Sequence, residues 1–495
     1  MPSPKQVTAI FDIGKTNKKF LLFDEDYTVL DKYQIELEQT VDDDGDPCED
    51  IEKLEVWISK QFNSAQKKYR IQGLNFSGYG ASLVHIDKNG SPVAPLYNYL
   101  KSYPEDLLKK FYEAVGGKEQ FSLETASPPM GMLNSGLQIY WLKHQKPKTF
   151  QKIKASLHFP NYLSYLFTRK KVSELTSIGC HTGLWNYKNN KYHNWLTESK
   201  IKSLLPKIQS TTKFFETKES QKIGPGIHDS SAALTPYLLG MDEAFMLIST
   251  GTWSITFNPF NDEPLTYKEL EKDCLCYLNI NGNQVKASRL FLGAEYSHQI
   301  KKISEHFAVS ENEFVAKPDT GLIKQLVRKN NNNFKLELEQ AYNSGPFPQK
   351  VSGSWDLNNF STSKEAYHQL MIDLVAIQSE SVKLAGGSNN IEKLIVTGGF
   401  SQNELFVTLL ASFFPEKKVY ISKLSNASAL GAAMVLNKNL VIASGAKQSH
   451  SENHDSSSEG ASSNSGRGRK DIEDLLGLKL VKPIEGLHLK NYSWV

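Results

Sequence analysis

Three features are scarce in this sequence, and each scarcity excludes a class of protein. The chain has only four cysteines, without the paired spacing of a disulfide framework, which predicts reduced thiols rather than a small secreted scaffold. No apolar run approaches the roughly 20 residues of a membrane span, and the amino end lacks the apolar core of a signal peptide. The net charge of +3 comes with dispersed lysines and is too small to indicate a nucleic-acid surface. We therefore expect a soluble, cytoplasmic protein that binds neither nucleic acid nor membrane.

Length and composition indicate two globular domains. A chain of 495 residues is longer than one hydrophobic core usually supports. Its content of 39% hydrophobic and 22% charged residues is typical of globular proteins.

The first strong pattern lies near the amino end. An apolar run, Val7 to Phe11, is followed by the polar stretch Asp12 to Asn17 and by a second apolar run, Phe20 to Phe23. Two β-prone runs joined by a short turn with a glycine predict a hairpin. The turn and its edge offer a carboxylate, small hydrogen-bonding side chains and several lysines, which suits a polyphosphate with its Mg²⁺. For this stretch alone, an ordinary solvated turn is the alternative.

The same design recurs about half a chain later. Residues 247–257 again read as an apolar run, a small polar turn around a glycine, and an apolar strand. Aligning Gly14 with Gly251 puts Ile10 on Leu247 and Phe20 on Phe257. One repeat at this separation indicates a duplicated domain rather than a solenoid.

Two later stretches carry further candidate chemistry. Gly224 to Leu234 places a single carboxylate, Asp229, between a Gly-Pro-Gly turn and small residues that can begin a helix, where Asp229 can act as the N-cap. Leu394 to Asn403 reads as a buried strand, a diglycine and a helix start. Glycines let the backbone approach a flat ring or a phosphate, and a helix amino end favours an anion. Each signal is weak alone, and their order along the chain gives them weight.

Taken together, these stretches resemble the FGGY family of carbohydrate kinases. The resemblance rests on residues 12–17, 77–82, 224–234, 249–254, 394–403 and 429–433. It implies an α/β protein with the two-domain actin-like ATPase (ribonuclease H-like) fold, a duplicated domain and a central cleft. Residues 1–243 would form the sugar-binding domain and residues 244–495 the nucleotide-binding domain. The His-Asp-Ser form at 228–230 and the Ser-x-Gly-Thr-Trp-Ser form at 249–254 are most similar to L-rhamnulose and L-fuculose kinases.

The resemblance also implies roles for individual residues. Asp229 would be the catalytic base, and Asp12 and Asp229 would lie at the Mg²⁺. The residues expected to bind ATP are Asp12, Gly14, Lys15, Thr16, Asn17, Lys19, Gly251, Thr252, Gly398, Gly399, Ser401 and Asn403. Those expected to bind the sugar are Tyr79, Gly80, Ala81, Ser82, Asn98, His228 and Asp229.

The chain departs from the family pattern near the expected sugar site. Leu100-Lys101 stands where many members have a Trp or Arg beside an acidic residue, which leaves the identity of the sugar open. His158 and His181 can line the pocket, although a lone histidine is more often an ordinary core or surface residue.

Two polar stretches are expected to lie outside the site. The acidic turn Asp42 to Asp46 lacks the glutamate that a Ca²⁺-binding loop needs, so we interpret it as a solvated connection. Residues 444–470 contain almost no large apolar side chains and predict a disordered insertion.

The function indicated is an ATP-dependent sugar kinase, most similar to kinases of L-rhamnulose or L-fuculose. Its partners would be a small sugar and ATP, with a homodimer common for such folds. Three alternatives stay open. The substrate can be xylulose, ribulose or glycerol, the chain can be a non-catalytic sugar sensor that kept the fold, or it can be a related actin-like ATPase.

Overall fold

The computed structural model describes residues 4–314, 317–329, 336–341, 355–388, 390–436, 469–487, 489 and 492. The chain forms two compact units, and each draws on several stretches of sequence. Unit 1 comprises residues 1–241, 277–283 and 426–475, and unit 2 comprises residues 242–276, 284–425 and 476–495. The division into 1–243 and 244–495 stays a prediction.

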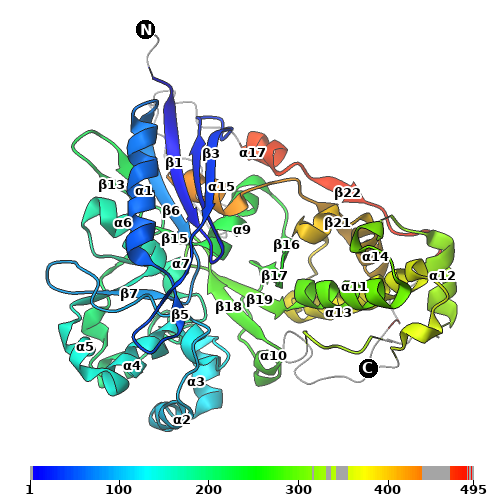
Figure 1. Ribbon diagram of the computed structural model, residues 1–495, viewed down its shortest axis with the longest axis horizontal. Coiled ribbons are helices and arrows are strands. Elements are labelled where there is room, and N and C mark those ends of the chain that lie inside the picture. Colours follow the sequence, from blue (N-terminus) through cyan, green and yellow to red (C-terminus); the bar gives the residue numbers. More distant parts are fainter. Residues whose placement is uncertain are drawn as a thin grey trace, which may run out of the picture. The chain divides into compact units, whose positions relative to one another are not determined.

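Unit 1 is built on a seven-stranded sheet with the order β13-β14-β6-β1-β2-β3, in which β15 also pairs with β6 (Figure 1). The expected hairpin is confirmed, because β1 and β2 pair antiparallel and β1 pairs parallel with β6. The bounds are β1 Gln6–Ile13, β2 Asn17–Phe23, β3 Val29–Glu36, β6 Arg70–Gly78, β13 Phe215–Glu216, β14 Lys222–Ile223 and β15 Ile227–His228.

Helices and small sheets surround this sheet within unit 1. The strands are β4 Thr40–Val41, β5 Pro47–Cys48, β7 Leu83–Ile86, β8 Ala155–His158, β9 Ser173–Glu174, β10 Trp185–Asn186, β11 Lys191–Tyr192 and β12 Ile208–Gln209. The helices are α1 Ile51–Gln66, α2 Glu105–Ala114, α3 Lys118–Thr125, α4 Ser135–Gln145, α5 Pro147–Lys152, α6 Phe159–Thr168, α7 Leu175–Ile178, α8 Trp195–Glu198, α9 Asp229–Gly240 and α15 Ala427–Met434. Helix α15 comes from the distant carboxyl-terminal part of the sequence, yet it packs against α9, β1 and β6.

Unit 2 repeats the arrangement of unit 1. Its sheet has the order β18-β19-β17-β16-β20-β21-β22, so a first strand lies between an antiparallel second strand and a parallel later strand in both units. The strands are β16 Phe245–Thr250, β17 Ser254–Asn258, β18 Cys274–Leu278, β19 Gln284–Leu290, β20 Lys393–Gly398, β21 Lys418–Ile421 and β22 Lys479–Val481. The helices are α10 Tyr267–Glu271, α11 Leu292–Phe307, α12 Thr320–Lys329, α13 Ser363–Gly386 and α14 Glu404–Phe413.

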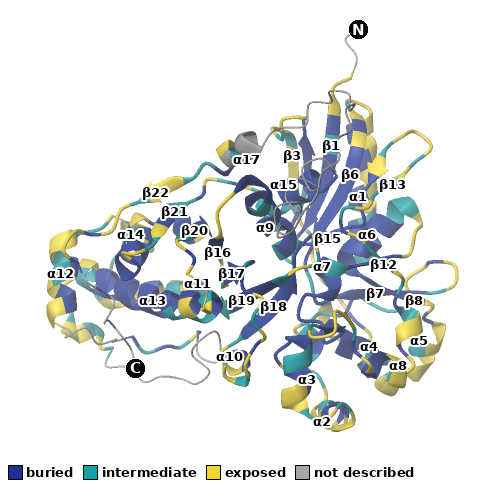
Figure 2. Cartoon of the chain, turned by 180° about the vertical axis from the view of Figure 1, so that it is seen from behind, coloured by how far each residue is buried: buried dark blue, intermediate teal, exposed yellow. Residues whose placement is uncertain are grey.

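Buried apolar side chains fill the core of each unit. In unit 1, Phe11 of β1 stacks between Phe20 and Phe76 at centroid distances of 4.4 and 5.9 Å. In unit 2, α13 is buried along most of its length and lies at the centre of the core. The central strands of the sheets and α13 are accordingly dark blue in Figure 2. This burial fixes the strand ends that carry the functional turns.

The two hairpins differ by one residue, which corrects the alignment made from sequence. In unit 1, Ile13 pairs with Lys18 and four residues form the turn, whereas in unit 2 Thr250 pairs with Ser254 and three residues form it. The register therefore makes Thr256, not Phe257, the counterpart of Phe20. The expected match of Phe20 with Phe257 was wrong because the second turn is shorter.

The disordered insertion predicted at residues 444–470 lies almost entirely outside the described residues. Residues 444–468 lie outside the described residues, while residues 469 and 470 begin helix α17, Arg469–Leu476. In the described part of the chain, no helix combines the length and the apolar character needed to cross a bilayer.

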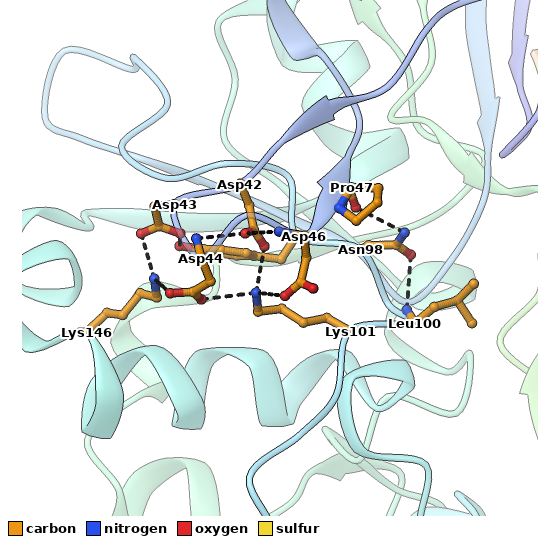
Figure 3. Close-up of polar contacts among 10 residues, drawn as sticks. Asp42, Asp43, Asp44, Asp46, Pro47, Asn98, Leu100, Lys101 and Lys146 are labelled. Atoms are coloured by element: carbon orange, nitrogen blue, oxygen red, sulfur yellow. Dashed lines mark hydrogen bonds and ion pairs between the residues drawn. The ribbon is translucent and has the colours of Figure 1, made fainter.

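The acidic turn between β4 and β5 is exposed from Asp43 to Asp46, as expected of a solvated connection, and it is also tied to the protein by ion pairs. Lys101 lies among Asp42, Asp44 and Asp46, at 2.8 Å from Asp42 and 3.0 Å from Asp44 (Figure 3). Lys146 pairs with Asp44 and with the neighbouring Asp43, at 2.7 Å in each case. The Lys101 side chain is only 6% exposed. The turn is therefore held by two lysines that are distant in sequence.

This cluster also explains the departure at Leu100-Lys101. The ammonium of Lys101 points to the acidic turn, and both Lys101 and Lys146 lie over the rings of Tyr97 and Trp141 at 5.4–5.9 Å. Lys101 thus anchors the segment that carries Asn98 and Tyr99 instead of contacting a substrate.

We predict that Lys101→Met lowers the free energy of unfolding by about 1–4 kcal/mol, between the value for an exposed ion pair and that for a buried pair left with one partner. Burial alone would raise the pKa of Asp42, but hydrogen bonds from Lys101 and the turn backbone hold this pKa below its usual value. The pKa of Asp44 is lowered mainly by Lys146.

Carboxyl groups with lowered folded-state pKa values stabilise above their unfolded pKa and lose that contribution as the pH falls through the folded pKa. The difference between wild type and Lys101→Met should therefore shrink in acid. Urea unfolding at several pH values measures it, with Lys53→Met at an exposed position of α1 as control. Equal stability of the Lys101 variant at neutral pH would show that the cluster contributes nothing.

Candidate active site

The turn of the β1–β2 hairpin is shaped from within by a buried lysine. The backbone N–H of Gly14 donates to the carbonyl of Asn17 at 3.0 Å, which closes the turn. Lys18 Nζ donates to the carbonyls of Gly14 and Lys15 at 3.2 and 2.9 Å and pairs with Glu49 at 3.0 Å. Lys18 and Glu49 are both almost fully buried. Lys18 therefore holds the turn in shape and is not available to a ligand, while Thr16 at the tip is exposed.

Asp12 lies at the carboxyl end of β1 with little compensation for its charge. Its carboxylate accepts a hydrogen bond from Ser428 at 2.9 Å and lies 3.9 Å from Lys19. Burial raises the pKa of Asp12, Lys19 and Ser428 lower it, and the charge of Asp229 raises it further. Because a buried charge is stabilised by a partner of opposite sign, the Asp12 carboxylate can bind a cation.

Strand pairing brings Asp12 and Asp229 to the same edge of the sheet. Ser77 of β6 pairs with Asp12 of β1 on one side and with Ile227 of β15 on the other. All three strands run parallel, so their carboxyl ends meet where ligands bind in open α/β sheets. Asp229 follows β15 directly. The two carboxylates are therefore close enough for the charge of one to raise the pKa of the other.

Asp229 is the first residue of α9, not its N-cap as the sequence suggested. His228 occupies the N-cap position and forms no capping hydrogen bond through its side chain. The carboxylate of Asp229 instead accepts from the backbone N–H of Ser230 at 2.6 Å. Its side chain is one-third exposed, at 33%. Burial raises the pKa of Asp229 to about 6, although the bonds from Ser230 oppose the shift. A carboxylate with such a pKa is well matched to proton transfer near neutral pH.

A neutral imidazole lies beside Asp229. His228 Nε2 is 3.3 Å from the Asp229 carboxylate and 3.0 Å from Cys180 Sγ, and burial lowers the pKa of His228 to about 3. Its ring stacks on Tyr277 at 5.5 Å and 13°. A side chain at Gly80 would come within 2.8 Å of both His228 and Cys180. The contact between His228 and Asp229 is therefore not an ion pair, and Gly80 leaves room for this ring.

The loop Ser77–Ser82 is held in place by hydrogen bonds and by burial of its side chains. Tyr79 is buried and its hydroxyl donates to Glu49 at 3.4 Å. Ala81 has a φ of 58°, and its carbonyl accepts from Gln138 at 2.7 Å. Ser82 is buried. The loop is thus held by its backbone and by Tyr79.

The remaining sugar-site candidates in unit 1 are largely engaged with protein groups. Asn98 donates to the carbonyl of Pro47 at 3.2 Å and accepts from the N–H of Leu100 (Figure 3). His158 is buried and lies 3.3 Å from the Ser135 hydroxyl, and burial followed by the charge of His228 lowers its pKa to about 3. His181 Nδ1 contacts the carbonyl of Leu133 at 3.2 Å.

In unit 2, the two motifs expected to bind nucleotide lie side by side. Thr250 at the end of β16 pairs with Gly398 at the end of the parallel strand β20. Thr250 Oγ1 donates to the carbonyl of Thr397 at 2.6 Å and accepts from the N–H of Phe400 at 3.0 Å. Gly398 has a φ of +84°, and a Cβ there would lie 1.9 Å from the carbonyl of Thr250. Only glycine fits this junction.

The turn of the β16–β17 hairpin is exposed but well supported. The N–H groups of Gly293 and Ala294 at the start of α11 donate to the carbonyl of Thr252 at 3.1 and 3.3 Å. A Cβ at Gly293 would lie 2.0 Å from the carbonyl of Gly251. Gly251 and Thr252 are exposed, so the turn presents its backbone and the Thr252 hydroxyl to solvent.

In residues 398–403 the backbone at Gly399 is unobstructed, whereas the side chains of Ser401 and Asn403 are hydrogen-bonded to protein groups. Nothing lies within 4 Å of a Cβ at Gly399, which is exposed. Ser401 donates to the carbonyl of Gly398 at 2.7 Å. Asn403 caps α14 and donates to the hydroxyl of Tyr367 at 3.0 Å. Ser401 and Asn403 therefore shape the loop.

Sequence reasoning missed several residues that build these sites. Ser428, which bonds Asp12, lies in the first turn of α15, and no local pattern connects it to a carboxylate 416 positions away. Thr250 was passed over in favour of its neighbours Gly251 and Thr252. Its position at the end of the predicted strand, directly before the turn, is the sequence signal that could have identified it.

Comparison with known proteins agrees with this geometry. Residues 7–230 match the description "FGGY family of carbohydrate kinases, N-terminal domain", and residues 242–444 match "Carbohydrate kinase FGGY, C-terminal domain". A rhamnulokinase from Oceanobacillus iheyensis is 22% identical over 408 residues, which cover 78% of this chain and 83% of that protein.

Two solved structures share the fold. A carbohydrate kinase from Novosphingobium aromaticivorans aligns with a TM-score of 0.75 and 21% identity, over 88% of this chain and 92% of that one. A xylulose kinase from Lactobacillus acidophilus aligns with a TM-score of 0.75 and 17% identity, over 98% and 95% of the two chains.

The expected fold class is confirmed by these structures and by the repeated strand order of the two units. The chain belongs to the FGGY family of carbohydrate kinases, phosphotransferases that use ATP with Mg²⁺ to phosphorylate a sugar hydroxyl.

Proposed function

We propose that Asp229 is the general base of the reaction. It would accept the proton of the attacking sugar hydroxyl as that oxygen bonds to the γ-phosphorus of ATP and the bond to the β–γ bridging oxygen breaks, releasing ADP. The observation that carries this role is the shared edge at which β1, β6 and β15 end, where Asp12 and Asp229 lie together. The pKa of about 6 supports it further.

Asp12 fits the role of the residue that holds Mg²⁺. Carboxylate oxygen is a ligand that Mg²⁺ prefers, and Asp12 is buried with one lysine, Lys19, and the hydroxyls of Ser428 and Ser77 to compensate its charge. The ion would neutralise charge on the phosphate oxygens. The expected contribution of Asp229 to the metal site stays a prediction.

The exposed turns would bind the phosphates, and the diglycine loop the adenosine. The supported backbones at residues 14–17 and 251–252 offer N–H groups and the hydroxyls of Thr16 and Thr252. Positioning and charge stabilisation of this kind supply most of the catalysis of phosphoryl transfer. The open backbone at Gly399 leaves room for a flat ring.

L-Rhamnulose or L-fuculose is the proposed acceptor. The His228-Asp229-Ser230 form and the similarity to proteins named rhamnulokinase favour these ketoses. A panel of the ketoses L-rhamnulose, L-fuculose, xylulose and ribulose, together with the polyol glycerol, tests the proposal when it is coupled to ADP detection. Fastest turnover with D-xylulose or glycerol would overturn it. The cytoplasmic location and a homodimer stay predictions.

We predict that Asp229→Asn lowers kcat by roughly 10²- to 10⁴-fold, because the amide cannot accept the proton. The fold should survive, since Asn can still accept the bond from Ser230. Steady-state kinetics and a thermal unfolding curve measure both effects. Asp106→Asn, at an exposed position of α2, is the matched control and should leave kcat unchanged. A folded Asp229→Asn protein with wild-type kcat removes the proposed base.

We predict that Asp12→Ala raises the Mg²⁺ concentration needed for half-maximal turnover by roughly 10- to 100-fold, because a partner of the metal is lost. Calorimetric titration of the sugar should give an unchanged Kd. If the Mg²⁺ requirement and Mg²⁺-ATP affinity both match wild type, Asp12 has no part in metal binding.

A further inference from the structure

Lys15, which was expected to bind phosphate, extends away from the tip of its turn. Its Nζ lies 5.4 Å from the ring centroid of Tyr79 and 5.4 Å from that of Tyr99. The two rings are 6.1 Å apart and inclined at 65°. Tyr79 was expected to bind the sugar, and Tyr99 follows Asn98, which was expected to bind it as well. The ammonium of Lys15 therefore lies in an aromatic cage formed by the sugar-side segments.

The charge of this ammonium is not balanced by a carboxylate. Glu49, the acidic residue with the largest effect on Lys15, is already paired with Lys18 at 3.0 Å. Among the described residues, no ion pair of Lys15 within 4.0 Å is found. Burial lowers the pKa of Lys15, and the charge of Lys18 lowers it further. The ring faces and the more distant charge of Glu49 compensate this cation, and neither accepts a hydrogen bond from it, so its hydrogen-bonding capacity is left for a ligand.

Tyr99 of the cage is affected by the charge of the proposed base. Burial raises the pKa of Tyr99, and the charge of Asp229 raises it further, which places this ring within electrostatic reach of Asp229. Lys19, by contrast, lies 3.9 Å from Asp12, on the side where the metal and phosphates are proposed. Lys15 and Lys19 thus leave one hairpin in different directions.

The cage is braced before any ligand arrives. Glu49 contacts both Lys18 inside the turn and the hydroxyl of Tyr79, and it forms a backbone bridge with Leu96. Lys101, two residues beyond Tyr99, is anchored in the acidic turn. A site that is rigid in advance loses little conformational entropy on binding.

We propose that Lys15 is a specificity-determining residue for the acceptor: from the Tyr79–Tyr99 cage its ammonium donates a hydrogen bond to an oxygen of the sugar. This proposal rests on the proposed function, because it takes a sugar bound beside Asp229 as its starting point. It reassigns Lys15 from the nucleotide to the acceptor and leaves the phosphates to the turn backbone, Thr16 and Lys19.

The test compares Lys15→Met with Lys19→Met, using whichever of L-rhamnulose, L-fuculose and D-xylulose the wild type phosphorylates fastest. Lys15→Met should raise KM for that sugar by roughly 10-fold or more, the loss expected for a hydrogen bond from a charged donor, with KM for ATP within about 2-fold. Lys19→Met should show the reverse pattern. Lys53→Met on α1 is the surface control. A Lys15 variant that raises KM for ATP and leaves KM for the sugar unchanged overturns the proposal.

A binding measurement separates this proposal from the kinase mechanism. Calorimetric titration of the same sugar into Asp229→Asn, without nucleotide, should give a Kd that the additional Lys15→Met change weakens by a similar factor. Equal sugar affinity of the two proteins overturns the role of Lys15 alone. Wild-type turnover by Asp229→Asn overturns the proposed base and leaves the Lys15 comparison intact. A wild-type chain that binds none of the three sugars overturns both.

Discussion

The site in unit 1 depends on a single strand, β6, that pairs in parallel on both sides. Its residue Ser77 faces Asp12 of β1 across one set of hydrogen bonds and Ile227 of β15 across the other. Because Asp229 follows β15 directly, this pairing brings two acidic residues 217 positions apart in sequence to the same edge. Neither acid needs a long or flexible side chain to get there. A slip of β1 by one residue would turn Asp12 to the opposite face of the sheet.

The turns of the two duplicated hairpins are held in shape by different contacts. In unit 1 the turn is shaped by Lys18, whose buried ammonium binds two of the turn carbonyls. In unit 2 the shorter turn is held from outside by the first N–H groups of α11. Both solutions leave the turn backbone fixed and its tip exposed. Both units therefore share a rigid strand end, but different atoms make it rigid in each unit.

The strand ends that carry the functional residues could be predicted from the sequence, but the groups that their side chains contact could not. Asp12 follows an apolar run directly and Asp229 lies between a Gly-Pro-Gly turn and a run of small residues, so both could be located from their neighbours alone. Lys18 and Lys19 alternate along β2, which predicts that they face opposite ways, but only the tertiary structure decides which face is buried. The ion pairs of the acidic turn could not be predicted because Lys101 and Lys146 are 55 and 102 residues away from their partners. The one-residue difference between the hairpins was hidden because both turns carry a glycine at the same place.

Helix α15 has a consequence for how the chain is made. Its backbone approaches α9 so closely that a Cβ at Gly431 would lie 1.9 Å from the carbonyl of Ala232. The same segment donates the Ser428 hydroxyl to Asp12, and Asn75 of β6 bonds to the carbonyl of Ala432. During synthesis the ribosome releases β1 and β6 several hundred residues before α15. The part of the first sheet at β1 and β6 that α15 contacts therefore stays uncovered until nearly the whole polypeptide has emerged, and an amino-terminal fragment ending at residue 241 would lack part of its own interior.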